Sequence, residues 1–299
     1  MATSDMNFLQ DGGRIESGAG KNSPTVSVVI PTWNSMSNNK CVERTLHSVI
    51  SQGVDAEVVV VDNFSKDSTR AVCELLGARV YQKSTSRSDA RNFGLEVTHG
   101  DFVLFLDSDH ELEPGALTEA LHRATEQELD AVFLKTTFLQ IDSNSRVSNS
   151  PLELELRLRG GVRFPNLIRR SSMQQIRFRA DLDLGEDHVF MESLLGRGAR
   201  IGSMDWGLRH YSKAGLAPVW ERSVQYGRAY RRNHDLPNKS KFQSELGVWN
   251  STGIRAYYTL LQSSPWEAFT LAWFLVVKYV GFAFGYIVPR REASRDVRS

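Results

Sequence analysis

The sequence has little of what identifies several common classes of protein. Its 299 residues include two cysteines, Cys41 and Cys73, and neither has a His or Cys at metal-ligand spacing. We interpret both as core or surface thiols of a protein from a reducing intracellular compartment. The net charge of +1 gives no global argument for binding to nucleic acid. The N-terminus also lacks the apolar run of a secretory signal.

Common nucleotide-binding signatures are missing as well. No Gly-x-Gly-x-x-Gly follows the first predicted strand, and the sequence contains no Gly-Lys-Ser or Gly-Lys-Thr. Neither a dinucleotide-binding fold nor a phosphate-loop NTPase is therefore supported. The Gly-rich loop with a basic residue that a sugar nucleotidyltransferase would need after its first strand is also missing.

From Thr25 onward, strand patterns alternate with helix patterns. Short apolar runs predict strands, and apolar residues spaced three or four apart predict helices between them. The predicted strands are residues 26–30, 57–61, a short one around Val80, 101–106 and 130–134, and the predicted helices are 38–51, 65–77, 86–98 and 113–126. This rhythm predicts an α/β protein with a doubly wound, mostly parallel sheet.

The most informative stretch is residues 101–109, in which five apolar residues lead to Asp107, Ser108 and Asp109. Such a run is typical of a strand buried on both faces, and open α/β sheets bind ligands at the carboxyl ends of their strands. Because residues i and i+2 of a strand point the same way, Asp107 and Asp109 are expected to face one ligand. A divalent cation shared with a phosphate would remove their mutual repulsion. The alternative is a solvated acidic turn.

Polar residues also follow the other predicted strands. Because the carboxyl ends of parallel strands meet at one edge of a sheet, we expect these residues to form a nucleotide site with the acidic pair. The residues after the first two strands are Pro31, Thr32, Trp33, Asn34, Asp62 and Asn63.

Four sequence blocks, in order along the chain, resemble those of family-2 glycosyltransferases of the GT-A fold. They are Ser-Val-Val-Ile-Pro-Thr-Trp-Asn at 27–34, the Val-Asp-Asn-Phe-Ser-Lys-Asp-Ser block within 59–69, Ser-Asp-Ala-Arg-Asn-Phe-Gly at 88–94 leading to the acidic pair, and Gly-Glu-Asp-His-Val-Phe at 185–190. The resemblance covers about residues 24–210. It implies a nucleotide-diphospho-sugar transferase that uses Mg²⁺ or Mn²⁺ and inverts the configuration of the anomeric carbon.

The resemblance implies a role for each donor-binding residue. Asp62 would accept a hydrogen bond from the nucleotide base, and the turn 31–34 would wrap the base and ribose. Arg91 would approach the diphosphate or ribose as a fixed cation, the alternative being a salt bridge on the helix surface. Asp109 would ligate the metal that bridges the diphosphate, while Asp107 would contact the ribose or a metal-bound water.

The fourth block contains two adjacent acids, Glu186 and Asp187. The resemblance implies that Asp187 is the general base that takes the proton from the acceptor hydroxyl. The adjacent carboxylate of Glu186 would favour proton uptake by Asp187. The alternative is that both acids cap the helix that begins near His188. The two roles are compatible, because a cap position also exposes a carboxylate to the cleft.

Two further features follow the fourth block. In related enzymes a His at the place of His210 ligates the metal or touches the diphosphate, and the alternative is a structural histidine. Between residues 209 and 241 the chain has eight Lys or Arg but only two acids. Here Arg228, Arg231 and Arg232 are candidates to bind a phosphate of the donor or of a lipid acceptor, the alternative being a solvated helix face.

Residues 269–288 are almost wholly apolar, with Lys278 the exception. Twenty helical residues just suffice to cross a bilayer. A span, however, would carry the basic tail away from the cytosol, against the positive-inside tendency. The flanking tryptophans and basic residues fit a helix lying in the membrane interface, and the alternative is a core helix. We therefore expect a peripheral or monotopic enzyme on the cytoplasmic face of a membrane.

These features predict a division of the chain and a class of acceptor. The expected parts are a disordered tail at 1–23, a GT-A catalytic domain at 24–212, a basic helical extension at 213–264, and an apolar, membrane-associated helix with a basic tail at 265–299.

Residues 136–160 leave the family's usual spacing and are expected to set acceptor specificity. Within them, the pattern of residues 152–158 fits a strand and a short helix equally well. We expect a glycan or polyprenyl-linked acceptor and a UDP- or GDP-sugar donor.

Two alternatives compete with this function. A catalytically silent protein that binds sugar nucleotides would keep the same fold, although the intact acidic motifs favour the enzyme. A haloacid-dehalogenase-type phosphatase also has Asp-x-Asp after a strand, but there the motif continues to Thr or Val, and here it continues to His110 and Glu111. The sequence lacks both several spans and a Gln-x-x-Arg-Trp motif, which favours transfer of one sugar over polymer synthesis.

Overall fold

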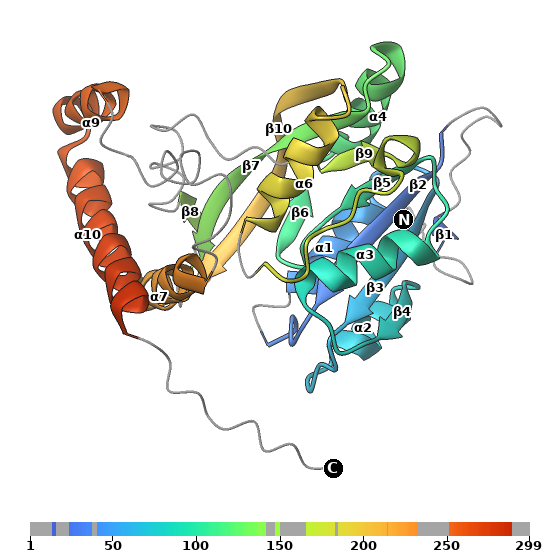
Figure 1. Ribbon diagram of the computed structural model, residues 1–299, viewed down its shortest axis with the longest axis horizontal. Helices are drawn as coiled ribbons and strands as arrows, with labels where there is room; N and C mark the ends of the chain where they lie inside the picture. Colours follow the sequence, from blue (N-terminus) through green and yellow to red (C-terminus); the bar gives the residue numbers. More distant parts are fainter. Residues whose placement is uncertain are drawn as a thin grey trace, which may run out of the picture. The chain divides into compact units, whose positions relative to one another are not determined.

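The computed structural model describes residues 14–15, 24–37, 41–141, 147–149, 166–182, 185–213, 215–232 and 251–288 (Figure 1). These residues fall into two compact units. The first unit draws on Met1–Leu139, Arg163–Asp181 and Gly185–Ser212, and the second on Gln140–Val162, Leu182–Leu184 and Lys213–Ser299. The segment 152–158, the basic C-terminal tail and all of the N-terminal tail before Pro24 except Arg14 and Ile15 lie outside the described residues.

The centre of the first unit is a parallel sheet of adjacent strands in the order β4 (Arg79–Gln82), β3 (Ala56–Asp62), β2 (Val26–Thr32) and β5 (Phe102–Phe105). Val28 of β2 is in register with Val58 on one side and Leu104 on the other, and all three are fully buried. Valine favours this extended backbone because its branched Cβ packs well on a pleated surface.

Antiparallel strands extend this centre, so the sheet is mixed. Beside β3 lies β1 (Arg14–Ile15), and beyond β5 follow β9 (Leu167–Arg169), β7 (Ala131–Ile141), β10 (Ile201–Lys213) and β6 (His110–Leu112). The β1–β3, β5–β9, β9–β7 and β10–β6 pairs are all antiparallel. The strands β2 to β5 are parallel to one another. These strands are joined by helices, and the sequence there alternates clearly between strand and helix patterns.

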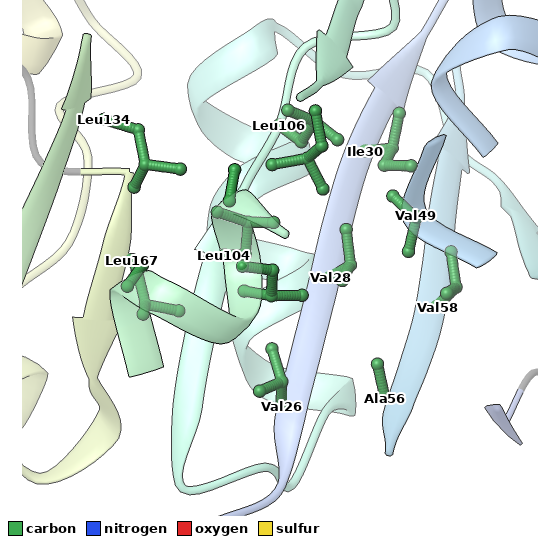
Figure 2. Packing of buried hydrophobic residues seen from close by; sticks show 14 of the residues in the cluster. Val26, Val28, Ile30, Val49, Ala56, Val58, Leu104, Leu106, Leu134 and Leu167 are labelled. Atoms are coloured by element: carbon green, nitrogen blue, oxygen red, sulfur yellow. The ribbon is translucent and has the colours of Figure 1, made fainter. Parts of the chain in front are cut away.

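Helices cover both faces of this sheet, as the doubly wound pattern predicts. One face packs against α1 (Cys41–Ile50), α2 (Thr69–Leu75) and α4 (Ala116–Glu126). The other face packs against α3 (Arg87–Val97) and α6 (Glu186–Leu195), together with the short 3₁₀ helix η1 (Arg170–Met173) that follows β9. Alternate residues of β2 point to opposite faces, so Val28 and Ile30 join the first core and Val29 joins the second. Figure 2 shows Val28 and Ile30 beside Val49 of α1.

Two of these helices begin at the edge of the sheet where the ligand is expected. Ser86 is the N-cap of α3, and its Oγ accepts a hydrogen bond of 3.1 Å from the backbone N–H of Asp89. Gly185 precedes α6 with φ = 82°, a left-handed conformation that glycine adopts without strain. Because the two helices begin at these residues, Arg87 and Glu186 lie in their first turns, and their side chains form an ion pair.

The second unit contains α7 (Leu216–Arg232), α9 (Ser251–Ser263), α10 (Pro265–Ile287) and the short strand β8 (Val147–Asn149). Helices α7 and α10 cross closely because small residues line their contact. A Cβ on Gly227 would lie 2.0 Å from the carbonyl oxygen of Phe282, and one on Gly285 would lie 2.0 Å from that of Val224.

The opposite face of α10 is apolar and exposed. Its 23 residues have a mean hydropathy of 1.6 in their most apolar window, so it is the one described helix with the length and composition of a membrane span. Apart from Tyr286, its large exposed residues recur at spacings of three or four and so form one stripe along the helix. The stripe comprises Trp266, Phe269, Trp273, Val276, Val280, Phe284 and Ile287.

Candidate functional site

A cavity of about 250 Å³ opens in the first unit at the carboxyl ends of β2, β3 and β5. This edge of an open α/β sheet is the expected ligand site. Most of the lining residues belong to the predicted blocks. The lining consists of Pro31, Thr32, Trp33, Val61, Asn63, Thr85, Ser86, Arg87, Ala90, Asp107, Ser108 and Asp109.

Asp62 lies beneath this cavity and is fully buried. One carboxylate oxygen accepts a hydrogen bond of 3.0 Å from the Thr32 hydroxyl, and the other accepts one of 3.0 Å from the backbone N–H of Ser65. The loops after β2 and β3 are joined further, because Asn34 N donates to the Ser65 hydroxyl at 2.7 Å. The residue expected to contact the base therefore holds the two loops together, while its neighbour Asn63 lines the cavity.

The rim of the cavity carries an exposed aromatic side chain. Trp33 is 67% exposed, although it follows a strand that is almost wholly buried. The next residue, Asn34, has φ = 49°, a left-handed conformation that asparagine tolerates better than most residues. This turn lifts the indole out of the sheet and leaves its face open to a flat ligand such as a base.

The acidic turn after β5 is held from below by α1. The Thr45 hydroxyl donates to the carbonyl oxygen of His110 at 2.6 Å and lies 3.0 Å from that of Ser108. The Ser108 hydroxyl lies 2.8 Å from that of Ser35. The backbone of the Asp-x-Asp segment is thus fixed, and its two carboxylates are left to the cavity. A solvated acidic turn would show no such support.

Arg91 joins the acidic turn to the predicted general base. This guanidinium is 4% exposed, and its Nη1 lies 2.6 Å from Asp187 Oδ1 while its Nη2 lies 2.7 Å from Asp107 Oδ1. Burial alone would raise the pKa of Asp107, but Arg91 and Arg87 outweigh it and bring that pKa to about 2. Arg91 does not line the cavity. It lies between two carboxylates and not on the helix surface, and its contact with the diphosphate or ribose stays a prediction.

Arg87, one helical turn earlier on α3, is the cation that lines the cavity. Its side chain is 50% exposed, it forms an ion pair with Glu186, and its Nη1 lies 3.9 Å from Asp107 Oδ2. Glu186 is only 4% exposed and is thus directed at Arg87, whereas Asp187 is 37% exposed. Although burial lowers the pKa of Arg87, the three carboxylates around it keep that pKa above its usual value. Arg87 was not among the predicted site residues, although its i, i+4 spacing from Arg91 puts both on one helix face.

Two histidines flank Asp109. His210 Nε2 lies 3.0 Å from Asp109 Oδ2, and His110 Nδ1 lies 3.2 Å from Asp109 Oδ1. They come together because His210 of β10 is paired in register with His110 of β6. Burial alone would raise the pKa of Asp109, but the two histidines hold it well below its usual value. His210 was predicted and His110 was not, although His110 follows Asp109 directly; the strand pairing explains why the two histidines meet.

These residues fit a divalent cation. Asp107, Asp109 and His110 each offer one ligand atom, and these atoms lie within 4.8 Å of one another. Carboxylate oxygen and imidazole nitrogen are common ligands of first-row divalent metals. The expected metal ligand Asp109, which lines the cavity, is also in contact with His210, which was expected to ligate the metal or touch the diphosphate.

The predicted phosphate-binding arginines belong to the second unit. Arg231 Nη1 lies 3.5 Å from the carbonyl oxygens of Tyr286 and Ile287, which end α10 without partners inside the helix. Arg228 is partly buried on α7, and the side chain of Arg232 lies outside the described residues. In the described structure Arg231 thus caps a helix, so phosphate binding by these three arginines stays a prediction.

Comparison with known proteins agrees with this geometry. The family model "Glycosyl transferase family 2" matches residues 27–184, which is more than half of the chain. The structure of the mannosyltransferase PcManGT from Pyrobaculum calidifontis in complex with GDP-Man and Mn²⁺ has a TM-score of 0.57 and 15% identity, covering 88% of this chain and 88% of that one. This likeness confirms the predicted GT-A type of α/β fold.

Curated relatives resemble parts of the chain. The succinoglycan biosynthesis protein ExoO of Rhizobium meliloti is 31% identical over 202 residues, which are 59% of this chain and 57% of ExoO. The GalNAc(5)-diNAcBac-PP-undecaprenol beta-1,3-glucosyltransferase of Campylobacter jejuni is 32% identical over 117 residues, 34% of this chain and 35% of that enzyme. The aligned regions thus span little more than half of ExoO and about a third of the glucosyltransferase. With more than half of its own residues matched by the family model, the chain belongs to glycosyl transferase family 2.

Proposed function

We propose that this protein moves one sugar from a nucleotide-diphosphate sugar to an acceptor hydroxyl or phosphate, with inversion at the anomeric carbon. One observation carries the proposal: Arg91 holds Asp187 beside the Asp107–Asp109 turn, and that turn lines the cavity. A transferase needs a donor diphosphate and an acceptor base side by side, because both must reach one carbon atom. The residues for both tasks are brought together from segments far apart in sequence.

The donor binds in the cavity, with its base between Trp33 and Asn63 and its diphosphate toward Arg87 and the acidic turn. The exposed indole offers a stacking face, and Asn63 offers an amide that can both donate and accept hydrogen bonds. Pro31 and Thr32 shape the wall between the base and the sugar. Asp62 supports this wall from beneath, through its hydrogen bonds to both loops.

Asp187 is the general base. It stands in the first turn of α6, its side chain is 37% exposed, and it is anchored on one side by Arg91. An acceptor hydroxyl that approaches this carboxylate would lose its proton to it as the oxygen attacks the anomeric carbon. Glu186 does not face the acceptor, because it forms an ion pair with Arg87. Glu186 is therefore a positioning residue for the cation that meets the diphosphate.

A divalent ion, Mg²⁺ or Mn²⁺, would be held by Asp109 with His210 beside it. When bound, it supplies positive charge that stabilises the departing nucleoside diphosphate. Asp109 keeps its carboxylate ionised for this task, since both histidines favour the charged form. Asp107 is held by Arg91 and is available to the ribose or to a water molecule on the ion.

The acceptor is a glycan or a polyprenyl-linked sugar, and the enzyme works on the cytoplasmic face of a membrane. The name of the Campylobacter relative gives it an undecaprenol-linked substrate, and that of ExoO places it in succinoglycan biosynthesis. In this chain, the exposed apolar stripe of α10 supports contact with a lipid surface. Residues 24–212 would then be the catalytic domain, 213–264 a basic helical extension, and 265–299 the membrane-associated part, with acceptor specificity at 136–160.

Donor binding tests this proposal. Purified full-length protein is titrated with UDP-sugars and GDP-sugars, with and without Mn²⁺, and the titration is repeated with Asp109→Ala. We expect tight, metal-dependent binding of one nucleotide sugar that the substitution abolishes. Asp205→Asn, which changes an exposed acid on β10, is the matched control and should bind like the wild type. If folded protein binds no nucleotide sugar under any of these conditions, the proposal is wrong.

Turnover separates the enzyme from a silent sugar-nucleotide-binding protein. A silent protein would bind the donor and release no nucleoside diphosphate, even with extracted lipid-linked acceptors. The proposed enzyme releases it slowly with water as acceptor and faster with the correct acceptor. Asp187→Asn should keep donor binding and lose this release.

A further inference from the structure

His110 is not among the metal ligands in the function proposed above. It follows Asp109 directly, begins β6, and was not implied by any sequence block. We propose that His110 is itself a ligand of the metal ion, and that its imidazole makes the site bind Mn²⁺ in preference to Mg²⁺. This inference rests on the proposed function, because it assumes that the acidic turn holds a divalent ion. It adds a ligand and a metal preference to that site.

The spacing of the candidate ligand atoms supports this assignment. His110 Nδ1 lies 3.2 Å from Asp109 Oδ1. Two neighbouring donors on an octahedral ion with bonds of about 2.1 Å lie about 3 Å apart. The two atoms therefore have the separation of adjacent ligands on one ion. His210 Nε2, at 3.0 Å from the other oxygen of Asp109, has the same relation to that carboxylate.

The hydrogen bonding of His110 points the same way. Its Nδ1 is buried and, among the described residues, makes no contact with hydrogen-bond geometry, although Asp109 is close. A buried polar atom without a well-formed hydrogen bond costs about 1–3 kcal/mol. Asp109 at 3.2 Å only partly offsets this cost for His110 Nδ1, because the contact lacks hydrogen-bond geometry. A metal ion beside Asp109 would use the lone pair of this nitrogen.

The position of His110 is set by the backbone. Its carbonyl oxygen accepts a hydrogen bond of 2.6 Å from Thr45, and its backbone N–H donates to the carbonyl oxygen of Asp107 at 3.0 Å. Its strand is paired with β10, and the His110 and His210 rings lie 4.9 Å apart between centroids. The imidazole is therefore held beside the carboxylates before any ligand arrives, as a preorganised metal site requires.

A nitrogen ligand changes which ion is preferred. Mg²⁺ is bound through oxygen and keeps much of its water, whereas Mn²⁺ accepts imidazole together with carboxylate. With Asp107 and Asp109 alone, the site would distinguish little between the two ions. With His110, and with His210 on the other side of Asp109, we expect Mn²⁺ to bind at least 10-fold more tightly than Mg²⁺.

Metal binding to the full chain tests the inference directly. Mn²⁺ is titrated by electron paramagnetic resonance, alone and with UDP or GDP, and Mg²⁺ affinity is measured by competition. In His110→Gln we expect Mn²⁺ affinity to fall at least 10-fold and Mg²⁺ affinity to change less than threefold. His122→Gln, an exposed histidine on α4, is the matched control and should leave both affinities unchanged.

A second readout works even if His110→Gln disturbs the turn. In His210→Gln, pulsed resonance of bound Mn²⁺ should still detect nitrogen coupling from one imidazole, that of His110. The absence of nitrogen coupling in this protein would overturn the inference. Equal losses of Mn²⁺ and Mg²⁺ affinity in a folded His110→Gln protein would overturn it too, since His110 would then only orient Asp109.

These outcomes are separate from failure of the proposed function. Sugar transfer that continues in excess chelator would contradict the metal inference and leave the transferase standing. Nitrogen-coupled Mn²⁺ in a protein that binds no nucleotide sugar would support the metal site and contradict the transferase.

Discussion

Arg91 Nη1 lies 2.6 Å from Asp187 Oδ1, although the two residues are 96 positions apart in the sequence. The other terminal nitrogen of the same guanidinium lies 2.7 Å from Asp107 Oδ1. A planar guanidinium can make two such contacts at a fixed angle, so Arg91 sets the distance between Asp187 and the acidic turn. In this arrangement the buried cation orients two carboxylates, while Arg87 lines the cavity, where we propose that it meets the diphosphate.

Replacing Arg91 by lysine should therefore impair catalysis more than donor binding. An ammonium keeps the charge but cannot span both carboxylates with the same geometry. We expect Arg91→Lys to lower kcat about 10²-fold, the usual effect of a small misplacement of catalytic groups, with a change in donor KM below threefold. Steady-state kinetics with the identified donor measure both constants. Arg70→Lys, an exposed pair with Glu74 on α2, is the control. A large rise in donor KM without a loss of kcat would return Arg91 to the diphosphate.

Replacing Arg87 should have the opposite pattern. Arg87→Gln removes the half-exposed cation that lines the cavity while leaving the Arg91 bridge in place. Loss of a charge-assisted hydrogen bond to a phosphate costs about 1.5–3 kcal/mol, which corresponds to roughly 10–150-fold weaker donor binding. Calorimetric titration with the donor measures this directly. The nucleoside without phosphates should bind equally to Arg87→Gln and wild type, and a loss there would place Arg87 near the base instead.

The contrast between these arginines shows what the sequence could predict. The strands β2 to β5 and the helices between them follow from local apolar patterns, which need no knowledge of distant partners. The acidic turn follows from the apolar run that precedes it, and the role of Asp187 from the family resemblance. The bridging role of Arg91 did not follow, because it depends on where α6 begins relative to α3. His110 was missed for the same kind of reason, since only the register of β6 with β10 puts it opposite His210.

Asp62 illustrates a further limit. Its motif predicted contact with the base, and the structure shows that its carboxylate also accepts hydrogen bonds from Thr32, Ser65 and Gln82. The motif gave no sign of these hydrogen bonds, because their donors come from three different loops and strands, and contact with the base stays a prediction. Asn63, beside it in sequence, is partly buried and lines the cavity.

Glu57 should stabilise the fold in a pH-dependent way. Its side chain is 18% exposed. One carboxylate oxygen accepts hydrogen bonds from the Ser27 hydroxyl at 2.7 Å and from the backbone N–H groups of His99 and Gly100. The other carboxylate oxygen lies 3.1 Å from the guanidinium of Arg79. Burial by itself raises the pKa of Glu57, but these donors bring it below the usual 4.5. Its contribution is therefore fully present above pH 4.5 and is lost as the pH falls through the lowered pKa.

Glu57→Gln should then lower the free energy of unfolding by about 1–3 kcal/mol at pH 7, because charge-assisted hydrogen bonds are replaced by neutral ones. Urea unfolding at pH 7 and at pH 3 measures the effect, and the difference between variant and wild type should shrink at the lower pH. Glu126→Gln, an exposed acid at the end of α4, is the control. A difference that grows on acidification would contradict the assigned sign.

The contact between α7 and α10 should not tolerate a single added methyl group. A Cβ on residue 285 would lie 2.0 Å from the carbonyl oxygen of Val224, a backbone atom that cannot move aside alone. We expect Gly285→Ala to force the helices apart and to cost about 1–3 kcal/mol, as overpacking does elsewhere. Ala283→Val adds bulk to an exposed position of the same helix and should leave stability unchanged. Thermal unfolding of both proteins decides whether these glycines hold the second unit together.

The exposed stripe of α10 should bind lipid. Phe269 and Trp273 are 57% and 54% exposed in water, and burying such side chains in a membrane interface gains about 1.5–3 kcal/mol each. The double substitution Phe269→Ser with Trp273→Ser should therefore weaken binding to vesicles containing anionic lipid by at least 10² fold in a co-sedimentation assay. Tyr258→Ser, 61% exposed on α9, is the control for a lost aromatic residue outside the stripe. If the double variant sediments like the wild type while remaining folded, α10 does not contact lipid through this face. If it stays in solution and still transfers sugar to a water-soluble acceptor, the stripe brings the enzyme to its lipid-linked substrate and has no part in the chemistry.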